Sequence, residues 1–138
     1  MELAAFEQRL DQGAGGVVTF TGLARGLGIG GAAIQSLFLQ HHPRLTQRSL
    51  EDTTAAAVQR FGLTAAEVVH RAGEIAPGEA IVWVAAAAPH RRAAFEAVDY
   101  LMDRLKTEAV FWKREDGTGG PTWIEPTETD HQSRSRWE

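Results

Sequence analysis

The sequence has no cysteine among its 138 residues. This absence excludes disulfides, zinc–thiolate sites, iron–sulfur clusters, and any thiol nucleophile or persulfide carrier on this chain. If the protein handles sulfur, the sulfur must therefore arrive on another molecule.

Long apolar runs and an excess of basic charge are also missing. The longest apolar run, 80–89, is mostly alanine and falls well short of the ~20 residues that a membrane helix needs. The first residues have neither the basic nor the apolar region of a secretory signal. The formal net charge is −4 and the isoelectric point about 5.7, whereas nucleic-acid binders usually carry a basic excess. We expect a cytoplasmic protein that binds neither membrane nor nucleic acid.

Lysine is scarce, because 12 of the 14 basic residues are arginine and only Lys106 and Lys113 are lysine. Guanidinium stays protonated, so arginine cannot replace an amine that acts as an acid, a base or a nucleophile. The two lysines are therefore candidates for a chemical role. Chance placement is the alternative.

Composition and periodicity indicate one α+β domain over residues 1–138. The sequence is 43% hydrophobic and 23% charged, as in a folded globular protein. Apolar spacing predicts helices over 3–10, 46–61 and 89–106, with Gly62 ending the second. Strands are predicted over 17–23, 33–40, 67–72, 80–87, 110–114 and 122–124. Residues 73–78 are predicted to be a turn, and from about residue 127 the chain is a polar tail. This order favours mainly antiparallel pairing.

A glycine-rich segment over 26–31 matches the G-x-G-x-x-G pattern of dinucleotide-binding folds. That pattern should open a helix, whereas the alternating residues over 33–40 favour a strand, so a mobile loop is the preferred interpretation. The neighbouring His41 and His42 have no carboxylate or thiolate at ligand spacing. We expect them to be structural or surface residues, and we expect neither a metal nor a cofactor.

His90, Arg91 and Arg92 follow Pro89 in the predicted first turn of a helix. The helix dipole disfavours cations there, by roughly 0.3–1 kcal/mol each when exposed. Such a cluster makes sense if an anion shares the site with the free backbone N–H groups. The alternative is a solvated basic patch offset by nearby acidic side chains.

Lys113 lies between aromatic residues and charges in the segment Phe111-Trp112-Lys113-Arg114-Glu115. Desolvation beside large rings would lower the pKa of an amine and prepare it for proton transfer. Trp112 could equally be a core residue.

Several ordered segments together resemble one family, the large, catalytic subunit of molybdopterin synthase. They are Val18-Thr19-Phe20-Thr21-Gly22-Leu23-Ala24-Arg25, His70-Arg71-Ala72-Gly73-Glu74-Ile75, Ala88-Pro89-His90-Arg91, Phe95-Glu96-Ala97, Leu105-Lys106-Thr107, Phe111-Trp112-Lys113-Arg114-Glu115 and Trp123-Ile124-Glu125. The resemblance covers nearly the whole chain.

The resemblance implies an α/β hammerhead fold and a homodimer that forms a heterotetramer with two copies of a small partner. That family inserts two sulfurs into cyclic pyranopterin monophosphate to form the dithiolene of molybdopterin. The sulfur comes from the C-terminal Gly-Gly thiocarboxylate of a ubiquitin-like protein. A chain without cysteine is consistent with this sulfur source.

The resemblance also implies the site residues. Lys106 and Lys113 are the expected catalytic pair, and the expected substrate-binding residues are Leu23, Ala24, Arg25, His90, Arg91, Lys106, Lys113, Arg114 and Glu115. We expect Arg25, His90 and Arg91 to hold the phosphate while the lysines transfer protons.

The sequence departs from the family pattern at two places. Glycine and isoleucine follow Arg25 where relatives often have polar residues. Pro126 and Thr127 follow Glu125 where relatives can place an arginine that reaches the neighbouring subunit, so Arg134 and Arg136 are the candidates to replace it. A non-enzymatic module that binds a phosphorylated metabolite or a ubiquitin-like protein is the competing hypothesis.

Overall fold

A long antiparallel pair of strands, β1 (Gly16–Leu23) and β5 (Ala80–Ala88), forms the middle of the protein. β3 (Ala65–His70) pairs with the other edge of β5, giving a three-stranded sheet in the order β1-β5-β3. This computed structural model describes residues 3–28, 31, 33–108 and 111–138. Within these ranges, no helix is long and apolar enough to cross a membrane.

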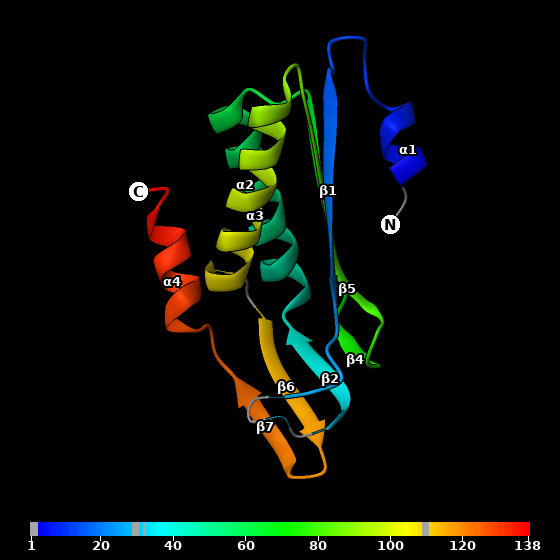
Figure 1. Cartoon of the computed structure of the whole chain (residues 1–138), viewed down its shortest axis with the longest axis vertical. Helices are drawn as coiled ribbons and strands as arrows, with labels where there is room; N and C mark the ends of the chain where they lie inside the picture. Colours follow the sequence, from blue (N-terminus) through cyan, green and yellow to red (C-terminus); the bar gives the residue numbers. More distant parts are fainter. Residues whose placement is uncertain (1–2, 29–30, 32, 109–110) are drawn as a thin grey trace.

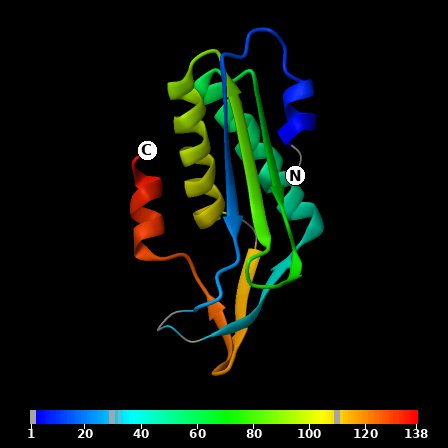
Figure 2. The same cartoon turned by 45° about the vertical axis from the view of Figure 1, so that its right-hand side comes forward.

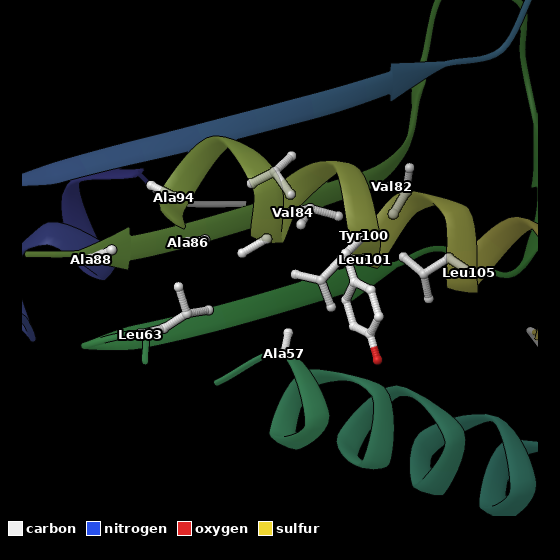
Figure 3. Close-up of a cluster of buried hydrophobic side chains, with 12 residues drawn as sticks. Ala57, Leu63, Val82, Val84, Ala86, Ala88, Ala94, Tyr100, Leu101 and Leu105 are labelled. Carbon is white, nitrogen blue, oxygen red and sulfur yellow. The ribbon is translucent and has the colours of Figure 1, made fainter. Parts of the chain in front are cut away.

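Helices cover both faces of this sheet. α2 (Pro43–Phe61) and α3 (Arg91–Glu108) lie on one face, and the short α1 (Leu3–Gln8) lies on the other (Figures 1 and 2). Because both faces of β5 are covered, its sequence is a continuous apolar run rather than an alternating one. Alternate residues of β5 belong to apolar clusters on opposite faces of the sheet. Figure 3 shows one of these clusters, in which Val82, Val84, Ala86 and Ala88 face the two long helices. Trp83, Ala85 and Ala87 pack with Phe6 of α1.

A second sheet of four antiparallel strands lies at the other end of the protein (Figure 1). Its order is β4-β2-β6-β7, from strands β4 (Gly73–Ile75), β2 (Ile34–His41), β6 (Phe111–Gly117) and β7 (Gly120–Ile124). β6 begins three residues after the last residue of α3. The end of one sheet-covering helix therefore lies close to the beginning of a strand in the other sheet.

The last helix, α4 (Glu128–Ser135), packs against α3 (Figures 1 and 2). Beyond its end, the Trp137 indole Nε1 donates a hydrogen bond to Asp103 Oδ2 over 2.7 Å. The Trp137 ring also contacts Phe61 and Tyr100 edge to face, with centroid separations of 5.8 and 5.5 Å. Arg134 forms an ion pair with Glu108 of α3.

The predicted α+β class and antiparallel pairing are confirmed. Gly62, with φ 63° and ψ 44°, ends α2 as predicted. The dinucleotide alternative is wrong, because strand β2 and not a helix follows the glycine-rich segment; its residues 29 and 30 lie outside the described residues.

Several element boundaries differ from the sequence predictions by two or three residues, among them those of β3, β6 and β7. Three further differences concern the predicted turn, the start of α3 and the polar tail. Residues 73–75 of the predicted turn form β4, which pairs with β2. α3 begins at Arg91 and not at Pro89. The polar tail contains α4, whose capping box at Thr127 offsets its lack of an apolar face.

Candidate functional site

Lys106 and Lys113 lie on either side of the junction between the two parts of the fold. Lys106 is in the last turn of α3, and Lys113 is in β6, where it pairs with Leu39 of β2 and Ile124 of β7. The Lys106 side chain is 51% exposed, whereas that of Lys113 is half-buried. The rare lysines are thus brought to one junction by two different elements.

The Lys113 side chain lies on the face of the second sheet that also carries Phe111 and its apolar contacts. Side chains alternate along a strand, so Lys113 shares its face with Phe111 and Glu115, while Trp112 and Arg114 point to the other face. Phe111 packs against the apolar cluster of Leu39, Ile75 and Ala24. Burial here lowers the pKa of Lys113 below its usual value of 10.5, and the charge of Lys106 lowers it further. The predicted desolvation of this amine is confirmed, but Trp112, which is 54% exposed, does not supply it.

Arg25 contributes a further positive charge to the site. It follows β1 and its charge also lowers the pKa of Lys113. The preceding Ala24 is buried, and its backbone forms hydrogen bonds with Glu79 O and Gly78 N over 2.9 and 2.8 Å. These bonds fix the backbone that presents Arg25, while the neighbouring Leu23 is exposed. Arg25 after β1, Lys106 of α3 and Lys113 of β6 are therefore close enough to interact electrostatically, an arrangement suited to an anionic substrate.

A carboxylate from α4 completes this cluster. Asp130 Oδ1 lies 4.0 Å from Lys106 Nζ. Partial burial alone would raise the pKa of Asp130, but hydrogen bonds with Thr127 and the charges of Lys106 and Lys113 outweigh it and hold the pKa below 3.8. Sequence inspection missed Asp130. The signal that could have found it is the T-x-x-D pattern at 127–130, an acidic variant of the capping box.

His70 is a second site neighbour that sequence inspection missed. Its ring stacks on Phe111 at a centroid separation of 3.9 Å, and its Nδ1 lies 2.7 Å from the carbonyl oxygen of Arg71. Burial lowers the His70 pKa to about 4, and the positive charge of Lys113 contributes to the decrease. His70 is therefore a neutral imidazole at neutral pH. Its only sequence signal is its position in the segment 70–75.

The structure does not bring Arg114 to the lysine pair. Its guanidinium is on the opposite face of β6, where it forms two hydrogen bonds with Asp116 of 2.7 and 3.0 Å. It also lies over the rings of Phe38 and Trp123, at 4.9 and 5.7 Å from their centroids. Glu115 is on the same face as Lys113.

His90 and Arg91 are separated from the lysines within one chain. They lie at the N-terminal end of α3, and Lys106 is 15 residues after Arg91, near the other end of the helix. At 1.5 Å per residue this spacing is about 22 Å. A hollow beside Arg91 is lined by Arg92, Phe95 and Glu96. A single chain therefore does not assemble the expected phosphate cradle of Arg25, His90 and Arg91.

The remaining candidates have structural roles in the chain. His42 is the N-cap of α2, and its Nδ1 accepts a hydrogen bond from Leu45 N over 3.3 Å. His41 stacks near Phe111 at a centroid separation of 6.3 Å. Arg134 pairs with Glu108, and Arg136 pairs with Asp99 and Asp103. These two arginines are thus engaged with α3 of their own chain.

The fold and site define a class: a cysteine-free α+β protein with a paired-lysine, arginine-containing site suited to acid–base chemistry on an anionic substrate. Comparison with known proteins identifies the family. A family model described as MoaE protein matches residues 1–108. The chain belongs to the MoaE family, which confirms the resemblance found in the sequence.

Individual relatives agree with this assignment. A molybdopterin synthase catalytic subunit from Caulobacter vibrioides is 52% identical over 124 residues, which are 90% of this chain and 81% of that protein. A solved MoaE protein from Burkholderia ambifaria superimposes with a TM-score of 0.80 at 34% identity, covering 99% of this chain and 91% of that one. A complex of subunits 1 and 2 of the molybdopterin-converting factor from Helicobacter pylori shares the fold, with a TM-score of 0.69 at 20% identity over 91% of this chain and 80% of that one.

Proposed function

We propose that this protein is the catalytic subunit of a molybdopterin synthase and transfers sulfur to cyclic pyranopterin monophosphate. The observation that carries the proposal is the convergence of the two rare lysines with Arg25, in a chain whose relatives are molybdopterin synthase catalytic subunits. A phosphorylated substrate needs cations, and proton transfer at near-neutral pH is favoured by an amine whose pKa lies below its usual value. Lys113 meets the second requirement.

The sulfur donor is a small ubiquitin-like subunit with a C-terminal Gly-Gly thiocarboxylate. The absence of cysteine supports this role, because the chain cannot carry the transferable sulfur itself. An extended glycine tail can approach a confined site where any Cβ would clash. The Helicobacter pylori complex contains two subunits of the molybdopterin-converting factor, which agrees with a small partner here.

A homodimer accounts for the two separated groups of cations. His90 and Arg91 lie about 22 Å along α3 from Lys106, so they serve the same substrate only when a second copy supplies them. In this arrangement, Arg25, Lys106, Lys113 and Glu115 of one subunit face His90 and Arg91 of the other. With one small partner per subunit, the assembly is a heterotetramer.

In the proposed reaction, the thiocarboxylate sulfur attacks a side-chain carbon of the pterin while a C–O bond of the cyclic phosphate breaks. Water then hydrolyses the resulting thioester, so the partner leaves with a C-terminal carboxylate and the sulfur stays on the pterin. A second thiocarboxylate supplies the other sulfur in the same way. Lys113, more easily deprotonated than an ordinary lysine, suits proton acceptance, and Lys106, half exposed beside Asp130, suits stabilisation of the opening phosphate. Arg25 holds the substrate anion from the end of β1. Ala24 positions Arg25 through the backbone bonds described above, and the exposed Leu23 lies next to it in the chain.

The test is reconstitution with the thiocarboxylated partner and cyclic pyranopterin monophosphate, followed by detection of the dithiolene product. Product formation that stops when the final two glycines of the partner are deleted is the expected result. Binding of the substrate or partner without product would favour the competing non-enzymatic module. No binding of either would overturn both hypotheses.

A further inference from the structure

The capping box of α4 places a carboxylate beside the lysine pair in a fixed orientation. Asp130 Oδ2 accepts a hydrogen bond from Thr127 N over 2.9 Å, and Thr127 Oγ1 accepts one from Asp130 N over 3.1 Å. The other carboxylate oxygen, Oδ1, lies 4.0 Å from Lys106 Nζ. One oxygen therefore completes the helix cap while the second is directed at the lysine.

The position of α4 on α3 is fixed independently at its other end. Arg136 donates a hydrogen bond of 2.8 Å to Asp103 Oδ2, and Trp137 Nε1 donates one of 2.7 Å to the same oxygen. Arg134 pairs with Glu108, two residues after Lys106. Because α4 is attached to the helix that carries Lys106, Asp130 and Lys106 keep their relative positions.

We propose that Asp130 is a positioning residue for the lysine pair, which orients Lys106 and offsets the mutual repulsion of the two ammonium groups. The inference rests on the proposed function only in giving the lysines an acid–base role. Asp130 does not touch the reacting atoms in this account. It acts through Lys106 and Lys113.

The charges around Lys113 show why one carboxylate matters. Lys106 from α3 and Arg25 from the end of β1 both lower its pKa, in addition to the larger effect of burial. His70 of β3 also lies near Lys113, but it is neutral above a pKa of about 4. Asp130 of α4 is the carboxylate that raises the Lys113 pKa and so opposes the two cations. Without it, Lys113 would lose its proton at a lower pH.

A purely structural cap is the alternative explanation, and the chain offers matched controls. Glu128 is an exposed acidic residue in the same first turn of α4, so Glu128→Gln removes an equal charge from the helix N-terminus. Thr127→Val removes the capping hydroxyl but keeps the Asp130 charge. Asp130→Asn keeps a side-chain oxygen for the Thr127 N–H and removes the charge. Asp130→Glu restores a charged capping-box residue.

The decisive measurement follows the lysines by NMR in protein labelled with ¹³C-lysine. The chain has two lysines, so the spectrum contains one side-chain Cε signal from each, and Lys106→Arg assigns them. We expect Asp130→Asn to lower the Lys113 pKa by about half a unit relative to wild type. Glu128→Gln, Thr127→Val and Asp130→Glu should each leave it within about 0.2 units.

Steady-state kinetics of the assembled synthase provide the second measurement. In Asp130→Asn, the limb of the kcat–pH profile that reports the Lys113 pKa should move to lower pH by the same half unit. kcat at the wild-type optimum should fall about tenfold with little change in KM, because the change affects orientation and not substrate binding. Asp130→Glu should recover most of this loss.

Two results would overturn the inference. One is an unchanged Lys113 titration in a folded Asp130→Asn variant. The other is a decrease of about half a unit in the Lys113 pKa of Thr127→Val, which would assign the effect to the helix cap. This second result can be obtained even if Asp130→Asn does not fold. Because the titration needs no substrate, its outcome is independent of the proposed reaction: inactive wild-type protein would refute that function and leave the lysine result standing.

Discussion

Replacing Trp137 by alanine should release α4 from the rest of the protein. Trp137 lies two residues after the end of α4, and its ring fills the angle between Phe61 of α2 and Tyr100 of α3. Its indole N–H donates to the carboxylate of Asp103. α4 has a polar sequence with no buried residue, so these contacts supply much of its attachment.

The expected cost follows from the contacts that are lost. Two edge-to-face aromatic pairs contribute about 2 kcal/mol together beyond the area that they bury. The hydrogen bond to Asp103 contributes about 1 kcal/mol, because Arg136 remains as a partner for the carboxylate. From these two contributions alone, Trp137→Ala should weaken the docking of α4 by at least about 3 kcal/mol. Trp137→Phe keeps a ring and loses the hydrogen bond, so it should cost about 1 kcal/mol.

Trypsin cleavage under native conditions measures this local release. Cleavage after Arg134 requires α4 to open, and its rate follows the open population when closing is fast. A 3 kcal/mol loss corresponds to roughly 100-fold faster cleavage in Trp137→Ala, against roughly fivefold in Trp137→Phe. Urea unfolding of the whole chain serves as the control for global stability. An increase below about threefold in Trp137→Ala would show that other contacts hold α4, and the reasoning would fail.

Three further results are expected. Lys106→Arg and Lys113→Arg should each lower the synthase rate by ~10²-fold or more, because arginine keeps the charge but cannot release its proton near neutral pH. The circular dichroism of both variants should be unchanged, and near-normal turnover in both would remove the acid–base assignment. His70 has a pKa lowered from 6.5 to about 4 in the folded protein, so the unfolded chain binds an extra proton between these values and stability is lost as pH falls through that range. Between pH 7 and 4.5 the wild type should lose about 2.5 kcal/mol more in urea unfolding than His70→Gln, and equal losses would contradict the burial of His70. Arg91→Ala should weaken binding of the phosphorylated substrate by about tenfold or more in calorimetry, with little change in melting temperature, whereas unchanged affinity would exclude Arg91 from the phosphate site.

Local sequence patterns were sufficient to predict most of the helices and strands and to single out the two lysines as chemically important. Apolar periodicity predicts α2, β1 and β5, because burial on one face or on two leaves a distinct spacing in the sequence. The scarcity of lysine and the absence of cysteine need no coordinates, since both are properties of composition. The lowered pKa of Lys113 was also predictable in direction, because a strand residue beside Phe111 enters a partly apolar environment.

Long-range packing decided the rest of the site. Alternation along β6 separates Lys113 from Arg114, but which face is interior depends on β2 and the cluster around Leu39, more than 70 residues earlier in the chain. The distance of His90 and Arg91 from Lys106 was already implied by the helix predicted over 89–106, but the elements that surround each end of α3 are set by tertiary packing. Asp130 meets Lys106 only because Trp137, Arg136 and Arg134 attach α4 to α3. Such contacts depend on the summed free energy of distant side chains, so a reading of neighbouring residues does not reveal them.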